Sequence, residues 1–108
     1  MLDIILRNCK IINPDKIFYS DIAIKGERIS LIEKNIKGKA KREIDLKGKL
    51  VFPAVIDPHV HFGLEAYNSR TCDDFYSGSI SALKGGVTTF IDYAIPSSCK
   101  HSIVEEVE

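Results

Sequence analysis

The sequence has few cysteines, no net charge and no long apolar run. Its 108 residues include three cysteines, Cys9, Cys72 and Cys99, and none of them lies in a C-x-x-C pair. This spacing excludes a thioredoxin-type motif and a zinc knuckle, and it favours free thiols in a reducing compartment. Fifteen basic residues balance fifteen acidic ones. Electrostatics therefore gives no reason to expect nucleic acid or an anionic membrane as a partner.

Signals for secretion and for crossing a membrane are also lacking. Asp3, Arg7 and Asn8 interrupt the first apolar residues, which excludes the apolar core of a signal peptide. No stretch approaches the roughly 20 apolar residues that span a bilayer. We therefore expect a cytoplasmic location with no membrane partner. The sequence contains no G-x-S-x-G, P-loop or G-x-G-x-x-G motif, so those catalytic and nucleotide-binding templates do not apply.

Short β-prone segments separated by turns fill the first 50 residues. Residues 22–25 and 28–32 flank Gly26-Glu27, a pattern that predicts a tight β-hairpin. Asn13-Pro14-Asp15 predicts a turn, and residues 38–42 form a polar stretch typical of a loop. Residues 43–47 alternate again between apolar and charged side chains. We expect residues 1–50 to form a small antiparallel β unit.

The pattern changes in residues 51–108. Residues 63–71 are polar and predict a loop, after which Asp73 or Asp74 can cap a helix that runs to about Lys84. Its apolar positions are Phe75, Ile80, Ala82 and Leu83, and Gly85-Gly86 suits its end. Residues 87–94 are strongly β-prone, and Ser97 or Ser98 can start a second helix that ends at Glu108. The order strand, loop, helix, strand, helix predicts an α/β fold with parallel strands.

Such a piece is a poor fold by itself. Two parallel strands with their helices leave an unpaired edge and half-covered helices. A (β/α)₈ barrel typically needs about 250 residues. We therefore expect residues 51–108 to be the beginning of a larger α/β fold.

One histidine pair is the most informative feature. His59 and His61 follow the apolar run at residues 50–52 and stand two positions apart in Pro53-Ala54-Val55-Ile56-Asp57-Pro58-His59-Val60-His61. In a strand, residues two apart share one face, so the two imidazoles project side by side with Asp57 on the same side. Two imidazoles held in this way can bind one divalent metal ion. The alternative is a pair of histidines that cap the strand end through hydrogen bonds to nearby backbone.

Two ligands do not complete a catalytic zinc site, which usually takes three protein ligands and a water. The other candidates in this chain are Asp57, Asp92, Cys99 and His101, and Cys72 in the loop is a further one, on a level with His101. Asp92 stands near the end of the next strand, where it could support the metal ligands, face a substrate or simply cap the strand.

Three stretches resemble the dihydropyrimidinase and hydantoinase family of metal-dependent amidohydrolases. Residues 1–50 resemble its opening β segment, and residues 53–61 its metal-binding strand. The third stretch runs from Asp73-Asp74-Phe75-Tyr76-Ser77-Gly78 through Gly85-Gly86-Val87-Thr88-Thr89-Phe90-Ile91-Asp92 and resembles the helix and strand that follow.

The resemblance implies a small β-sandwich joined to a (β/α)₈ barrel, with residues 1–50 in the first and residues 51–108 at the start of the second. It implies two Zn²⁺ ions bridged by a carboxylated lysine, with His59 and His61 as ligands of the more buried ion. The activity it implies is hydrolysis of a cyclic amide, a dihydropyrimidine or hydantoin ring, to an N-carbamoyl amino acid, by a homotetramer.

The departures from the family pattern concern the remaining ligands. In the family, the bridging lysine, two later histidines and a later aspartate all lie beyond position 108. We therefore expect this chain alone to be inactive. Phe62-Gly63 stand where dihydroorotases carry an arginine, which argues against a dihydroorotase, and Ala54 replaces a usual glycine.

Two other functions compete with this interpretation. One is a non-catalytic, dihydropyrimidinase-like scaffold or interaction protein, although such relatives have lost metal ligands and His59 and His61 are both present. The other is a free-standing β domain that binds a partner through its open sheet edge.

Overall fold

The computed structural model describes residues 1–66, 68–95, 102 and 104. The chain divides into two compact units, Met1–Pro53 and Ala54–Glu108, and each is described by itself. The predicted boundary between residues 50 and 51 is close to this division. The assignment of the two segments to a β-sandwich and a barrel stays a prediction. The second helix expected from Ser97 or Ser98 lies outside the described residues.

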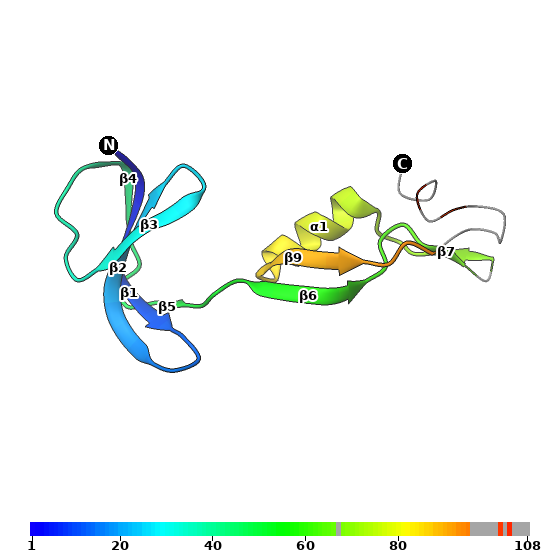
Figure 1. Cartoon of the computed structure of the whole chain (residues 1–108), viewed down its shortest axis with the longest axis horizontal. Coiled ribbons are helices and arrows are strands. Elements are labelled where there is room, and N and C mark those ends of the chain that lie inside the picture. Colours follow the sequence, from blue (N-terminus) through cyan, green and yellow to red (C-terminus); the bar gives the residue numbers. More distant parts are fainter. Residues whose placement is uncertain (67, 96–101, 103, 105–108) are drawn as a thin grey trace. The chain divides into compact units, whose positions relative to one another are not determined.

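A five-stranded mixed sheet forms the first unit (Figure 1). Its strands are β1 (Leu2–Ile12), β2 (Ile17–Lys25), β3 (Arg28–Glu33), β4 (Ala40–Asp45) and β5 (Leu50–Val51). The order is β3-β2-β1-β4, and β5 also pairs with β1. The expected all-antiparallel unit is wrong, because β4 and β5 both run parallel to β1. A short segment crosses the sheet after β3 and brings β4 back to the first residues of β1.

The two turns predicted in this unit are confirmed. β2 and β3 pair antiparallel up to Lys25 and Arg28, with Gly26-Glu27 as the two-residue connection. Gly26 has a φ of 59°, a conformation that glycine adopts without steric cost. The turn at residues 13–16 closes with a hydrogen bond of 2.9 Å from the Asn13 N–H to the Lys16 carbonyl.

The crossing segment is fixed through the peptide groups and side chain of Ile36. Its N–H donates to Asp21 Oδ2 at 3.1 Å, and its carbonyl accepts from Arg7 Nη1 at 2.7 Å. Arg7 and Asp21 also pair with each other at 2.8 Å. The Ile36 side chain is buried against Ile5 and Ala23 on the sheet face. The Ile36 side chain is buried, and both of its backbone polar groups have hydrogen-bond partners in the Arg7–Asp21 ion pair. The short crossing segment can therefore lie against the sheet without leaving a buried polar group unpaired.

Asp21 is buried and carries three hydrogen bonds. Besides Arg7 and Ile36, the Asn8 N–H donates to its Oδ1 at 3.0 Å. Burial acts to raise the pKa of Asp21, but the Arg7 guanidinium and the two backbone N–H groups outweigh it and hold the pKa below its ordinary value. The carboxylate therefore stabilises the folded unit in its charged form.

The apolar run at residues 50–52 does not lead into the histidine strand as one segment. Leu50 and Val51 pair with Lys10 and Ile11 and so belong to the first sheet. Pro53 has no N–H to continue the ladder, which ends the pairing before the second unit begins.

A βαβ arrangement forms the second unit. β6 (Val55–Val60) and β9 (Val87–Asp92) pair in parallel, and α1 (Phe75–Lys84) lies between them in the sequence. Figure 1 shows α1 alongside this strand pair. The parallel pairing predicted from the sequence is therefore confirmed.

The predicted start and end of the helix are also confirmed, and the structure selects Asp74 as the cap. Asp74 Oδ1 accepts the Ser77 N–H at 2.8 Å, and the Asp74 N–H donates to Ser77 Oγ at 3.1 Å. The bond from the Ser77 N–H lowers the pKa of Asp74. At the other end, Gly85 caps the helix and Gly86 takes a φ of 89°.

Apolar side chains of this unit remain exposed, as expected for two strands and one helix. Phe75 and Leu83 on α1 are 58% and 63% exposed, and Ile56 on β6 is 61% exposed. A parallel sheet is normally covered on both faces, and this strand pair is too narrow to cover the helix. Within the described part of the chain, no helix combines the length and apolar character needed to cross a membrane.

We expect Asp21→Asn to lower the free energy of unfolding of the first unit by roughly 2–4 kcal/mol at neutral pH. The substitution removes the buried carboxylate that pairs with the Arg7 guanidinium and leaves that cation without its partner. Urea unfolding followed by far-UV circular dichroism measures this. Asp15→Asn is the matched control, since Asp15 is exposed in the turn and the same charge change there is expected to cost less than about 0.5 kcal/mol.

The difference between wild type and Asp21→Asn is expected to depend on pH. Because folding lowers the pKa of Asp21, its contribution is fully present above the ordinary aspartate pKa of about 3.9 and is lost as the pH falls through the folded pKa. The two proteins should therefore approach equal stability in acid. A difference that stays constant from neutral pH to below about pH 3 would contradict this account.

Candidate metal site at the end of the parallel strands

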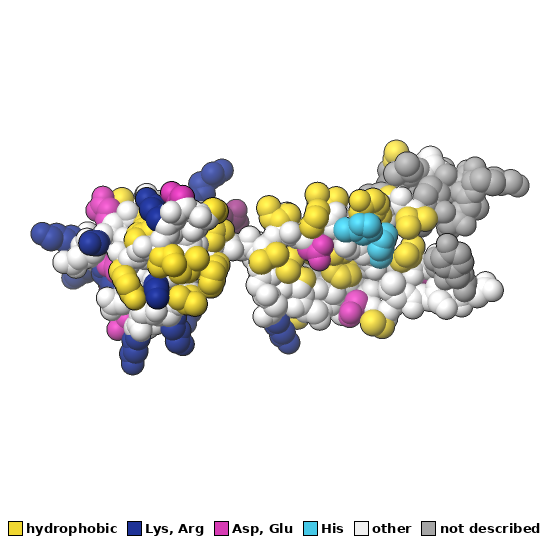
Figure 2. All heavy atoms as spheres, turned by 90° about the horizontal axis from the view of Figure 1, so that it is seen from below, with side chains coloured by type: hydrophobic (Ala, Val, Ile, Leu, Met, Phe, Trp, Pro, Cys, Tyr) yellow, Lys and Arg dark blue, Asp and Glu magenta, His cyan; other side chains and the backbone are white. Residues whose placement is uncertain are grey.

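The two histidines lie side by side where β6 ends. His59 is in the strand and His61 is the first residue after it. Their Nε2 atoms are 3.1 Å apart, and their ring centroids are 5.0 Å apart at an interplanar angle of 72°. Figure 2 shows the described histidines, in cyan, next to each other on the surface of this unit. The two imidazoles therefore lie together, as expected.

Asp57 has a different role from the one its spacing suggests. Its Oδ1 accepts the N–H of His59 at 3.1 Å, across Pro58. The pairing of β6 with β9 is irregular between Asp57 and Val60, so simple alternation does not continue through this segment. Among the described residues, no cluster of three His, Cys, Asp or Glu side chains could hold a metal ion. Asp57 therefore fixes the backbone of His59 and is not a third ligand in this structure.

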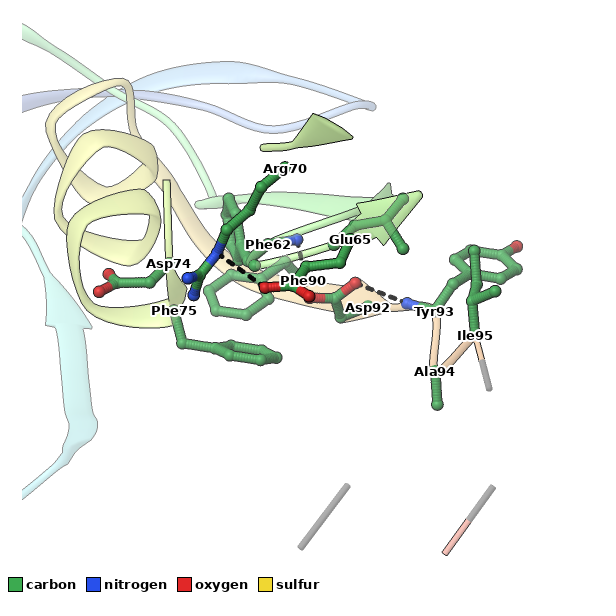
Figure 3. Close-up of a pocket in the computed structure, with 12 residues that line it drawn as sticks. Phe62, Glu65, Arg70, Asp74, Phe75, Phe90, Asp92, Tyr93, Ala94 and Ile95 are labelled. Carbon is green, nitrogen blue, oxygen red and sulfur yellow. Dashed lines mark hydrogen bonds and ion pairs between the residues drawn. The ribbon is translucent and has the colours of Figure 1, made fainter. Parts of the chain in front are cut away.

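Asp92 joins the ends of the two parallel strands. Its Oδ2 accepts the Phe62 N–H at 3.1 Å, and its Oδ1 accepts the Tyr93 N–H at 2.7 Å. Figure 3 shows the Asp92 carboxylate directed at the backbone of Tyr93. Of the roles considered for Asp92 from the sequence, the structure shows a strand cap. This cap fixes the residue that follows His61.

A small aromatic cluster joins the helix to the same place. The Phe62 ring packs edge-on against Phe90 of β9 at 5.0 Å and Phe75 of α1 at 6.0 Å, measured between centroids. Gly78 is the buried residue of α1, and a Cβ atom there would lie only 2.5 Å from Cδ1 of Phe62. The glycine therefore lets the helix approach the ring that follows the histidine pair.

A cavity of about 610 Å³ lies beside these strand ends. Aromatic and apolar side chains form much of its wall, with Asp92, Glu65, Arg70 and Asp74 as charged groups (Figure 3). Tyr93 lines the cavity and also contacts both imidazoles, with centroid distances of 4.4 Å to His59 and 5.5 Å to His61. It thus connects the cavity with the histidine pair.

The expected loop at residues 63–71 contains a short hairpin. β7 (Glu65–Ala66) pairs antiparallel with β8 (Ser69–Arg70), and Arg70 Nε lies 3.7 Å from Glu65 Oε1. Hydrogen bonds across the base, including Thr71 N–H to the Leu64 carbonyl at 2.9 Å, order the segment. Each strand of this hairpin has two residues, which is too short to produce a strand pattern in a polar sequence.

The histidine pair fits a divalent metal. Two imidazole nitrogens bound to one tetrahedral zinc, each about 2.0–2.1 Å from it, stand about 3.3 Å apart. The Nε2 atoms are 3.1 Å apart, where the two rings are hydrogen-bonded to each other, and this distance is close to the separation that a metal ion requires. His61 Nδ1 is buried and has no hydrogen-bond partner among the described residues, so Nε2 is the nitrogen presented to a ligand. Metal binding itself stays a prediction.

The remaining candidates do not add a ligand in the described part of the chain. Cys72 is exposed, and its Sγ lies 3.7 Å from Asp73 Oδ2. Cys9 is buried in the first unit, where burial raises the pKa of its thiol. Cys99 and His101 lie outside the described residues.

Sequence reasoning missed three residues that shape this site: Phe62, Gly78 and Tyr93. Phe62 and Tyr93 follow a candidate ligand and a candidate carboxylate, but adjacency in sequence does not reveal ring contacts. Gly78 was visible as a glycine inside an expected helix, which costs about 1 kcal/mol relative to alanine and so indicates a packing reason.

Comparisons with known proteins agree on one group of relatives. The chain is 36% identical to a D-hydantoinase of Ralstonia pickettii over 98% of its own length and 23% of the relative's. It is 36% identical to a dihydropyrimidinase of Arabidopsis thaliana over 86% of its length and 18% of the relative's. The solved structure of a D-hydantoinase (dihydropyrimidinase) from Thermus sp. matches with a TM-score of 0.86 and 36% identity, over 96% of this chain and 23% of that one.

The chain thus spans about a quarter of the length of the relatives it matches. No family model matches it. The structural similarity confirms the β-rich first segment and the helix that follows it as parts of a hydantoinase-like fold.

We expect Gly78→Ala to destabilise the second unit by about 1–3 kcal/mol, because the new methyl group overlaps the Phe62 ring. The result would oppose the intrinsic helix preference, which favours alanine by about 1 kcal/mol. Thermal unfolding monitored by helix circular dichroism measures it. Gly85→Ala is the control: Gly85 has a helical φ of −82°, and its added Cβ lies at 3.4 Å from the nearest atom. Equal stability of the two variants would exclude the Phe62 contact as the reason for the glycine.

Proposed function

Because this chain belongs to the hydantoinase and dihydropyrimidinase family, we propose that it takes part in zinc-dependent hydrolysis of a cyclic amide, with a dihydropyrimidine or hydantoin ring as substrate and an N-carbamoyl amino acid as product. The observation that carries the proposal is the pair of Nε2 atoms 3.1 Å apart at the end of a parallel strand. In parallel βα folds, active sites lie at the carboxyl ends of the strands.

Each residue of this site has a distinct task in the proposal. His59 and His61 hold the metal through Nε2. Asp92 fixes the backbone at the ends of β6 and β9 through the N–H groups of Phe62 and Tyr93. The neighbouring cavity provides room for a ring substrate. When bound, zinc supplies Lewis-acid polarisation of the amide carbonyl and a nucleophilic water at neutral pH.

The finer fold assignment belongs to the same proposal. β6, α1 and β9 correspond to the opening βαβ unit of a (β/α)₈ barrel, and the mixed sheet of the first unit corresponds to part of a β-sandwich. The parallel pairing of β6 with β9 and the exposed apolar side chains on both strands support the first assignment.

We also propose that residues 1–108 alone do not turn over substrate. A catalytic zinc takes three protein ligands, and the described residues bring two imidazoles together without a third donor. The comparisons reported above give the scaffold alternative no support, because the D-hydantoinase and the dihydropyrimidinase that the chain matches carry enzyme names.

The first prediction concerns metal affinity. We expect the chain to bind Zn²⁺ or Co²⁺ through His59 and His61, so that His59→Ala or His61→Ala weakens binding. Removing a partner that only orients a ligand costs about 10–100-fold in affinity, and loss of a ligand should cost at least as much. Titration against a chromophoric chelator measures the affinity. His101→Ala is the matched control, and an equal loss in that variant would show that the ligand set is wrong.

The second prediction concerns activity. The chain incubated with zinc should show no hydrolysis of dihydrouracil or hydantoin, whereas the Thermus sp. D-hydantoinase carrying residues 1–108 in place of its matching segment should hydrolyse the ring. In that graft, His59→Ala or His61→Ala should lower kcat/KM by about 100-fold or more, because the metal contributes several kcal/mol. Turnover by the chain alone, or a folded graft indifferent to both substitutions, would contradict the proposal.

A further inference from the structure

Three rings meet at the end of β6, and Tyr93 is the one without an assigned task. Its ring lies 4.4 Å from that of His59 at 33° and 5.5 Å from that of His61 at 43°, measured between centroids. The two imidazoles contact each other at 5.0 Å. Each ring therefore contacts the other two. Offset and tilted aromatic contacts in this range are favourable and depend on orientation.

Hydrogen bonds fix the main chain of Tyr93 beside the histidine pair. The Tyr93 N–H is shared between Asp92 Oδ1 at 2.7 Å and the Val60 carbonyl at 3.4 Å. Val60 stands between the two histidines in the sequence. The other Asp92 oxygen accepts the Phe62 N–H at 3.1 Å, immediately after His61. The main chain at Tyr93 and Asp92 is thus bonded to the residues on both sides of His61, which places the Tyr93 ring within reach of the two imidazoles.

In the metal-free protein the two imidazoles are hydrogen-bonded to each other, Nε2 to Nε2, at 3.1 Å. Metal binding removes the shared proton and this bond, so a contact with another side chain must then hold the rings in place. His59 is exposed and Asp57 bonds only its backbone N–H, not its ring. Holding two side chains in one geometry costs conformational entropy, which binding must supply unless the protein has already ordered them. In the described part of the chain, the Tyr93 ring is the further aromatic side chain that contacts both imidazoles.

We infer that Tyr93 is a positioning residue, which stacks against His59 and His61 and holds their Nε2 atoms at the separation that a single metal ion requires. The inference rests on the proposed function for the metal, but not for the ring arrangement. It assigns the effect to the face of the aromatic ring. The hydroxyl group has no part in it.

Two measurements on the 108-residue chain test the inference. In the metal-free protein, ¹H–¹³C NMR reports the imidazole C–H groups of His59 and His61, whose shifts respond to the Tyr93 ring current. We expect Tyr93→Ala to move these signals and Tyr93→Phe to leave them near their wild-type positions. In titrations with Co²⁺, Tyr93→Ala should weaken binding by about tenfold, as loss of a ligand-orienting partner does, and Tyr93→Phe should bind as wild type.

Two further variants serve as controls. Tyr76→Ala removes the same side chain from α1, where it is 77% exposed, and should change neither measurement. Tyr93→Leu keeps apolar bulk at the strand end if Tyr93→Ala fails to fold, and it should still lose the ring-current shifts and the affinity.

The outcomes separate the inference from the proposed function. If His59→Ala and His61→Ala bind Co²⁺ as tightly as wild type, the proposed metal site is wrong. The NMR shifts of the metal-free protein still test the ring arrangement in that case. Unchanged shifts and unchanged affinity in Tyr93→Ala or Tyr93→Leu overturn the positioning role. A loss in Tyr93→Phe equal to that in Tyr93→Ala also overturns it, because the hydroxyl group would then be responsible.

Discussion

The carboxylate of Asp92 accepts one hydrogen bond from Phe62 and one from Tyr93, and the local arrangement of the candidate site depends on this pair of bonds. Phe62 and Asp92 are 30 positions apart in the sequence, with α1 between them. The Asp92 carboxylate therefore joins the ends of two strands, β6 and β9, that are distant in the sequence. A carboxylate can accept both bonds because each of its oxygens is an acceptor. With the strand ends joined, His61 and Tyr93 face each other.

The same junction explains how the helix takes part. Phe62 lies against Phe90 and Phe75, and Gly78 leaves room for its ring. The residue that follows the histidine pair is therefore held in an aromatic cluster, although many apolar side chains of this unit remain exposed.

Short-range rules predicted the features that depend on neighbours in sequence. The Gly26-Glu27 hairpin, the helix cap at Asp74 and the glycine at the helix end all follow from local backbone chemistry. The expected antiparallel unit was wrong because the direction of β4 depends on Ile36 crossing the sheet, held by Arg7 and Asp21. These contacts join residues 15 to 29 positions apart, and no local pattern encodes them.

By itself, the sequence determined that His59 and His61 lie on one side of a strand end, because residues two positions apart in an extended chain share a face. It also determined the family, through motifs that cover nearly the whole chain. The bond from the His59 backbone to Asp57 spans two positions and is local. Only the tertiary structure decided that Asp92 joins the strands and that Tyr93 packs on both imidazoles. Such contacts depend on how β6 and β9 pair in space, and the pairing register is set by packing across the whole unit and not by the residues at the site.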